Sequence, residues 1–213
     1  MKNFILLITV FVLSAASLPG FTQTMMKSAH DFQNHSWNTN TGKDVCVVCH
    51  TPHKTSVTAK AAPLWNHAST KINFIIYAGT TMQEIVGQPD GNSKLCLSCH
   101  DGTVAVANAG SMTTKSKRMI GINNPETSLT NDHRVSFTYN TALTKTDLGL
   151  HDPSLQTGIG NTTIDASMLF DGKMQCASCH DVHNLAYSLK TNSSSLLIKS
   201  NNASELCLTC HKK

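Results

Sequence analysis

The chain repeats one short pattern of cysteine and histidine, C-x-x-C-H, four times in 213 residues. Each copy places two cysteines three positions apart and a histidine directly after the second cysteine. The pattern uses all eight cysteines of the chain, so no cysteine is left for another role. We number the copies sites one to four in chain order: Cys46, Cys49 and His50; Cys96, Cys99 and His100; Cys176, Cys179 and His180; Cys207, Cys210 and His211.

C-x-x-C-H is the attachment motif of c-type haem. Two thiols at this spacing reach the two vinyl groups on one edge of the porphyrin, and the next residue lies under the ring, where histidine can bind iron. Eight cysteines in an exported chain would also suggest four disulfides, and C-x-x-C pairs with histidine would suggest zinc. Neither alternative explains a histidine directly after every pair. The motifs therefore predict four covalently attached haem c cofactors.

The N-terminus has the layout of a secretory signal. A short positive start is followed by an apolar run from Phe4 to Ala16 and then by Pro19 and Gly20. A transmembrane anchor needs about 20 apolar residues, so this run is too short to be one. We predict a cleaved signal over residues 1–22, with cleavage after Ser17 or after Thr22. The mature protein is then exported, to the cell surface or the medium or otherwise to the periplasm, with no retained membrane anchor.

Aliphatic residues are scarce in the rest of the chain. Leu, Ile, Val and Phe number 37 in the 191 residues after position 22, a share typical of disordered chains. The formal net charge of +4 is too small for charge-driven disorder. We therefore predict a multihaem cytochrome fold: mostly coil with short α-helices, little or no sheet, and a core made of stacked haems. Helical turns are expected at 93–99 and 205–211, and a short strand at 72–77.

The sequence charge overstates any attraction to anionic partners. Four haems would bring eight propionates, which together outweigh the formal net charge of +4. The chain also has no basic patch with interleaved aromatic residues. We predict no nucleic-acid partner.

The four sites alternate between two kinds. Sites one and three continue as C-H-x-x-H, whereas sites two and four share the approach Ser-x-Leu-Cys. This order predicts two diverged two-haem modules, at 23–115 and 116–213, joined in a Gly-, Ser-, Thr- and Asn-rich stretch from Asn108 to Thr130. The alternative is that the attachment chemistry alone makes any two sites look alike. The shared serine lead-in favours duplication.

Seven histidines lie outside the attachment motifs, and four six-coordinate irons would need four distal ligands. His53 and His183 are the strongest candidates, since each lies three residues after a proximal histidine and so on the same face of a helical turn. Neither can reach the far face of its own haem, so each would bind a neighbouring one. His67 and His133 lie between sites and are candidates whose alternative is an ordinary surface histidine. For His30, the roles of distal ligand and of ordinary surface histidine are equally balanced.

Two further histidines and several methionines have weaker claims. Methionine as a distal ligand would raise the haem potential, but no methionine here lies in a repeated context. The residues in this group are His35 and His151, expected to be bystanders, and Met82, Met112, Met119 and Met174.

Several runs resemble the multihaem cytochromes c with doubled C-x-x-C-H motifs, and among these the tetrahaem type that polymerises into extracellular cytochrome filaments (the OmcE type). The runs are Cys46 to His53, Trp65 to His67, Ser93 to Gly102, Asp132 to Phe137, and Cys176 to His183. The resemblance covers most of the chain from His30 to His211. It implies bis-histidine irons and haems stacked in alternating parallel and crossed pairs.

The resemblance also implies roles for individual residues. It implies His53, His67, His133 and His183 as distal ligands, and it makes His30 a candidate ligand across a subunit interface. Arg134 stands where the family pattern leads us to expect proline, and this departure leaves His133 plausible as a ligand.

These observations favour an electron conduit over an enzyme. Closely spaced low-spin haems pass electrons without binding a substrate, and the protein sets each potential through ligands, burial and hydrogen bonds. The expected form is a filament subunit that polymerises with itself and exchanges electrons with redox partner cytochromes. The alternatives are a soluble periplasmic carrier, a multihaem nitrite or hydroxylamine oxidoreductase with one open iron position, and a membrane-anchored quinol-oxidising cytochrome.

Overall fold

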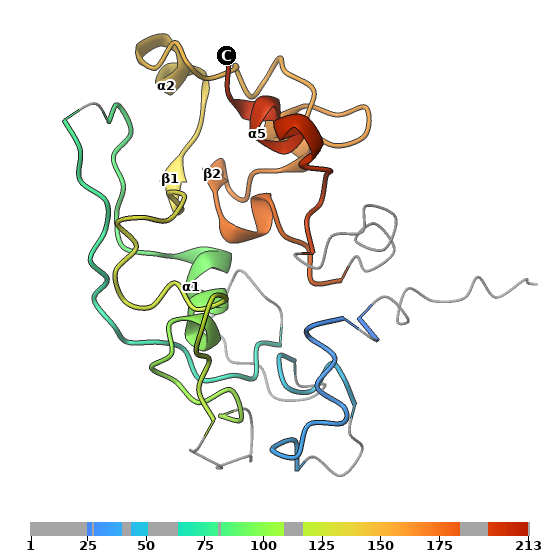
Figure 1. Ribbon diagram of the computed structural model, residues 1–213. Coiled ribbons are helices and arrows are strands. Elements are labelled where there is room, and N and C mark those ends of the chain that lie inside the picture. The colour runs from blue at the N-terminus through green and yellow to red at the C-terminus, as the bar shows by residue number, and fades with distance from the viewer. Residues whose placement is uncertain are drawn as a thin grey trace, which may run out of the picture.

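The computed structural model describes residues 25–26, 28–39, 44–50, 64–80, 82–108, 117–183 and 196–212. The signal peptide, His53, Met112 and the predicted module boundary at 115–116 lie outside them. The described chain is mostly coil with short helices and one two-stranded sheet (Figure 1). Its elements are α1 (Gly91–His100), β1 (Phe137–Thr138), α2 (Thr141–Thr146), α3 (Ile164–Ser167), β2 (Lys173–Met174), η2 (Cys176–Ser178), η3 (Asn202–Ser204) and α5 (Glu205–Cys210).

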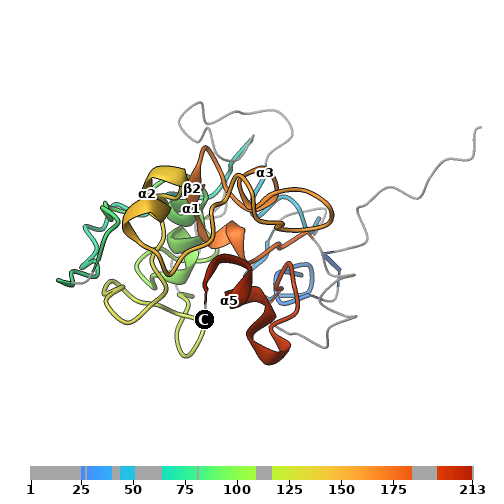
Figure 2. The ribbon, with the colours of Figure 1, turned by 90° about the horizontal axis from the view of Figure 1, so that it is seen from above.

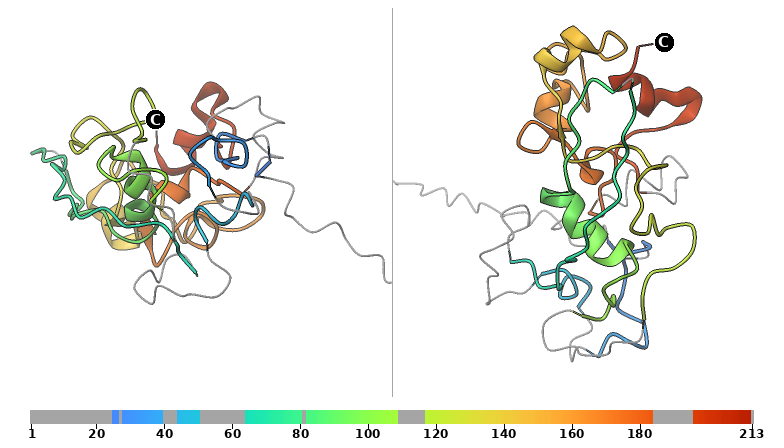
Figure 3. Two further views of the ribbon diagram at one scale, coloured as in Figure 1. Left: turned by 90° about the horizontal axis from the view of Figure 1, so that it is seen from below. Right: turned by 90° about the vertical axis from the view of Figure 1, so that its left-hand side faces the viewer.

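The body is longer in one direction than in the others. α2 and α5 lie at one end, α1 lies in the middle, and residues 28–39 lie toward the other end (Figure 3). Seen from above, α2 and β2 overlap α1 (Figure 2). This arrangement places site four at one end of the molecule, site two in the middle and site one toward the other end.

The sheet is small and joins two segments of the second half of the chain. β1 and β2 pair antiparallel, with Phe137 opposite Met174 and Thr138 opposite Lys173. The prediction of a strand at 72–77 was wrong. That segment makes a single bridge, from Ile75 to Ser128, and the Ile75 side chain is 63% exposed. An apolar run forms a strand only where a neighbouring backbone pairs with it over several residues.

The helical turns predicted before sites two and four are confirmed. α1 contains both cysteines of site two and ends at His100, and α5 contains both cysteines of site four. A helical turn suits the motif because it brings residues three and four positions apart onto one face. The motif thereby presents its two thiols and its histidine on the same side of the chain.

Two small apolar clusters hold the described residues together. The larger lies in the second half of the chain and includes Cys210 and Cys179 at its edge. The smaller is built around Trp37 and Val48, with Cys49 and Cys99 packed against it. Because attachment cysteines border both clusters, a group bound at them would extend these clusters and enlarge the apolar core.

The chain near site four is fixed by Tyr139. Its hydroxyl donates a 2.6 Å hydrogen bond to the carbonyl oxygen of His151, and the ring is 2% exposed. The backbone N–H of His151 in turn donates to the carbonyl of Cys210, and Leu150 forms an antiparallel bridge with His211. His151 thus supports site four through its backbone.

No helix in the described ranges is both long enough and apolar enough to cross a membrane.

Candidate haem-binding centres

Three of the four attachment histidines face a second histidine from a distant part of the chain. The imidazole centroids of His50 and His183 are 6.3 Å apart. Those of His100 and His30 are 5.9 Å apart. Those of His211 and His133 are 6.4 Å apart.

These separations match two imidazoles bound to opposite faces of one metal. A histidine nitrogen binds a metal at about 2 Å and the ring centroid lies roughly 1 Å behind it, so two opposed rings have centroids about 6 Å apart. Ordinary contacts between aromatic rings span a similar range. The distinctive feature is that the three pairs each join one attachment histidine to one of the spare histidines.

Site four has a cavity beside its histidine pair. The cavity has a volume of about 270 Å³, and both His133 and His211 line it. The other residues around it are Tyr77, Thr130, Asn131, Asp132 and Arg134. His133 and His211 are both exposed, so they are accessible as ligands.

His183 is oriented by its own segment. The Asp181 carboxylate lies 3.6 Å from Nδ1 of His183, and this interaction raises the pKa of the imidazole. A carboxylate bonded to one ring nitrogen leaves the other nitrogen for a metal and fixes the ring. The ring of His183 lies beside that of His50, with centroids 6.3 Å apart. Its counterpart in site one, His53, lies outside the described residues.

His30 is the spare histidine that meets site two. Burial and the neighbouring His100 lower the pKa of His30 to about 4, so the imidazole is neutral at physiological pH. Neutral imidazole is the form that binds metals. The structure thus brings His30 opposite His100 within one chain, whereas the family resemblance implied a role between subunits.

His67 is placed differently from the other ligand candidates. It is 4% exposed, and its two ring nitrogens lie 2.8 Å from the carbonyl oxygen of Ala68 and 3.0 Å from that of Ala105. Its Nε2 is also 3.5 Å from Sγ of Cys99. His67 therefore lies beside an attachment cysteine of site two, and it is His30 that faces His100.

The weaker candidates have other surroundings. His35 packs its ring against Phe32 and Trp37, with centroids 5.8 and 5.4 Å away. Met174 is 4% exposed and belongs to β2 within the larger apolar cluster. Neither residue is placed opposite an attachment histidine.

All eight cysteines lie in the described residues, and each is a free thiol. Burial raises the pKa of Cys49 and of Cys210 to about 11 and that of Cys99 to about 12. Site two lies beside site three, because α1 packs against η2 and the thiols of Cys96 and Cys176 shift each other's pKa. This contact stabilises the thiolate of Cys176 and lowers its pKa.

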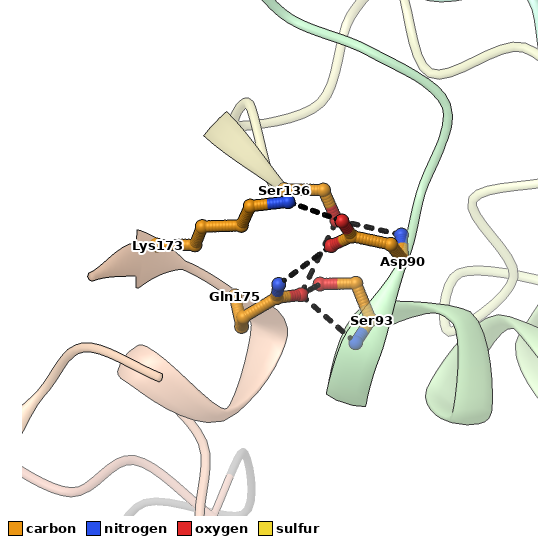
Figure 4. Close-up of polar contacts among 5 residues, drawn as sticks. All are labelled: Asp90, Ser93, Ser136, Lys173 and Gln175. Atoms are coloured by element: carbon orange, nitrogen blue, oxygen red, sulfur yellow. Dashed lines mark hydrogen bonds and ion pairs between the residues drawn. The ribbon is translucent and has the colours of Figure 1, made fainter. Parts of the chain in front are cut away.

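A buried polar cluster ties site two to site three (Figure 4). Oε1 of Gln175 accepts hydrogen bonds from the backbone N–H and hydroxyl of Ser93 and, at 3.2 Å, from the hydroxyl of Ser136. Its amide nitrogen donates to Asp90 at 2.9 Å, and Asp90 also forms an ion pair with Lys173. We call these five residues the Gln175 cluster.

The Gln175 cluster connects directly to the attachment cysteines. Gln175 precedes Cys176, whose backbone N–H donates to the hydroxyl of Ser93 at 3.0 Å. Ser93 lies one helical turn before Cys96 in α1. The cluster therefore fixes the two sites relative to each other across the two predicted modules. Sequence analysis singled out Ser93 as part of a shared approach but gave no signal for Gln175.

Unpartnered buried donors test whether these sites fit haem. Among the described residues, buried side-chain nitrogens without a partner occur in His30, Trp65 and Arg134. His30 belongs to site two, Trp65 forms a backbone bridge with His50 of site one, and Arg134 follows His133 of site four. Buried donors normally have acceptors. Haem carboxylates would serve Trp65 and Arg134, and the imidazole of His30 would bind the iron. The residues present thus fit haem.

The sequence matches no protein-family model and has no significant match among curated proteins. Within the described ranges, no three histidine, cysteine, aspartate or glutamate side chains converge as a metal-binding cluster.

Proposed function

We propose that this protein is a tetrahaem c-type cytochrome that conducts electrons through closely spaced bis-histidine haems. The observation that carries the proposal is the pairing of three attachment histidines with spare histidines at 5.9, 6.3 and 6.4 Å. Haem supplies a one-electron couple at each site when bound. The chain's own residues attach it, supply both axial nitrogens and set its surroundings.

The pairing supports conduction rather than catalysis on a substrate. A substrate would need an open iron position, and a second histidine stands opposite His50, His100 and His211. His180 is the remaining attachment histidine, and we propose His53 as its second ligand. The exchange would then be reciprocal, because His183 of site three serves site one and His53 of site one serves site three.

The contacts between sites support a continuous path for electrons. Sites one and three share the pair His50 and His183, and sites two and three touch through Cys96 and Cys176. Cys179 of site three packs against the apolar cluster that contains Cys210 of site four. Site three therefore neighbours all the others, and electrons entering at any site would have a short route to the rest.

The finer form of the function is a self-polymerising subunit of an extracellular filament. It rests on the family resemblance of the motifs and on the export signal. Within this proposal the mature protein leaves the cell, binds copies of itself and exchanges electrons with partner cytochromes.

The test uses the native secreted holoprotein. Intact mass should show four haems, and the oxidised spectrum should be entirely low-spin. Carbon monoxide binding without denaturation, or a high-spin signal, would overturn the conduit in favour of an enzyme. Negative-stain electron microscopy decides the finer form: uniform filaments support the subunit role, and small particles alone refute it.

A further inference from the structure

Arg134 is held in place by two neighbours. Its Nη1 lies 3.0 Å from Oε1 of Glu84, whose side chain is 7% exposed. Its guanidinium carbon lies 4.3 Å from the centroid of the Tyr77 ring, a cation–π contact. The ion pair uses one edge of the guanidinium and the aromatic ring covers one face. The group is thereby fixed, although arginine is normally a flexible side chain.

One donor of this fixed group has no acceptor. Nε of Arg134 is buried and without a hydrogen-bond partner. Leaving such a donor unpaired costs about 1–3 kcal/mol, more when it is charged. Arg134 also lines the cavity of about 270 Å³ that His133 and His211 line. Its side chain is 35% exposed, so an occupant of the cavity that carried an acceptor would bond to the remaining donors of the guanidinium.

The chemistry of arginine narrows the class of acceptor. Its planar fork matches a carboxylate in two parallel charge-assisted hydrogen bonds. Glu84 already takes Nη1, so the second carboxylate must come from the occupant. We propose that Arg134 anchors a carboxylate of the group held between His133 and His211, which under the proposed function is a propionate of the site-four haem. This inference rests on the proposed function.

The anchor has a measurable electrical consequence. The oxidised iron centre carries one more positive charge than the reduced centre, so a fixed cation nearby favours the reduced form. Replacing Arg134 leaves Glu84 and the propionate uncompensated and favours the oxidised form. One unit charge at roughly 10 Å and an effective dielectric constant near 20 changes the equilibrium by about tenfold or somewhat more.

The test compares Arg134→Gln with Arg118→Gln in the four-haem holoprotein. Arg118 is exposed and is the only other arginine, so this control removes the same charge elsewhere. Arg134→Gln should lower the reduction potential of one of the four haems by about 59 mV. For a one-electron couple this is about a tenfold shift toward the oxidised form. The resonance Raman propionate-bending band should shift in the same variant, and Arg118→Gln should change neither quantity.

Further variants separate the anchor from the ion pair. Glu84→Gln should raise the reduction potential of the same haem, since it removes the neighbouring negative charge. Arg134→Lys should leave the reduction potential of that haem nearly unchanged but should still shift the propionate-bending band. Lysine keeps the positive charge but lacks the planar guanidinium. Four haems with an unchanged propionate band in Arg134→Gln would overturn the anchor alone. A wild-type protein without haem would overturn the proposed function.

Discussion

Sites two and four share the approach Ser-x-Leu-Cys but have different surroundings. Ser93 of site two is fully buried and bonded within the Gln175 cluster, at the first turn of the ten-residue α1. Ser204 of site four has a left-handed backbone with φ of 64°, makes no capping hydrogen bond and precedes the six-residue α5. The same motif therefore produces a helical turn in both places, and only tertiary contacts make one of them rigid.

The largest expected effect concerns the distal partners of these two sites. Under the proposed function, His30→Ala and His133→Ala should each convert one haem of four from low spin to high spin, because each would remove one histidine ligand of the iron. Electron paramagnetic resonance of the oxidised protein measures this directly. His35→Ala is the matched control and should remain fully low-spin. A low-spin spectrum in His30→Ala would assign the ligand of site two to another residue, with His67 as the next candidate.

The Gln175 cluster should dominate the stability difference between the two sites. Gln175→Ala leaves the buried N–H and hydroxyl of Ser93 without their acceptor, so we expect a loss of about 2–4 kcal/mol in unfolding free energy. Denaturant unfolding of the holoprotein gives this quantity. The matched control is Gln88→Ala, whose amide bonds only the backbone of Phe74. Its expected loss is about 1 kcal/mol, and equal losses in both variants would contradict a special role for the cluster.

Replacing the two lead-in serines compares the sites directly. Ser93→Ala should cost about 1–3 kcal/mol, because its hydroxyl donates to Gln175 and accepts from the backbone of Cys176. Ser204→Ala should change stability by no more than about 0.5 kcal/mol. Ser204→Gly should be neutral or stabilising, since glycine adopts positive φ without strain. Thermal unfolding of the three variants ranks them, and similar losses for both alanine variants would remove the contrast.

The smallest effect is a dependence on pH. Burial raises the pKa of Asp90, but hydrogen bonds from Lys173 and Gln175 outweigh it and hold the pKa below its ordinary value of 3.8. A depressed folded pKa stabilises the protein above pH 3.8, and this contribution is lost as the pH falls through the folded value. Asp90→Asn should flatten the decline in stability between about pH 5 and about pH 3. An unchanged decline would show that other carboxylates cause it.

Much of the local structure could be predicted from the sequence. The C-x-x-C-H motif fixes the spacing of its thiols and histidine, so the helical turns at sites two and four follow from it. The strand expected at 72–77 does not form, because its partner strand would have to come from elsewhere in the fold. Only Ser128 pairs with this segment, through a single bridge to Ile75. Local patterns describe what a segment can form, whereas pairing depends on distant segments.

Which spare histidine lies opposite which attachment histidine could likewise be predicted only in part. The spacing of C-H-x-x-H indicated that His183 would serve a neighbouring site, and the structure brings it to His50. The choice of His30 over His67 for site two could not be derived, since it depends on how residues 28–39 fold back. Gln175 carries no sequence signal because a single glutamine acquires its role only through burial beside Ser93.

The pairing of His50 with His183 also has a consequence for the order of assembly. When the polypeptide emerges N-terminus first, the first attachment motif is exposed long before its partner. Closing so large a loop is slow and entropically costly. Under the proposed function, a haem at site one would therefore lack its second histidine ligand until the third motif has been exported. A chain truncated before residue 183 should carry its first haem with one face permanently open, and such a product would be reactive toward oxygen and peroxide.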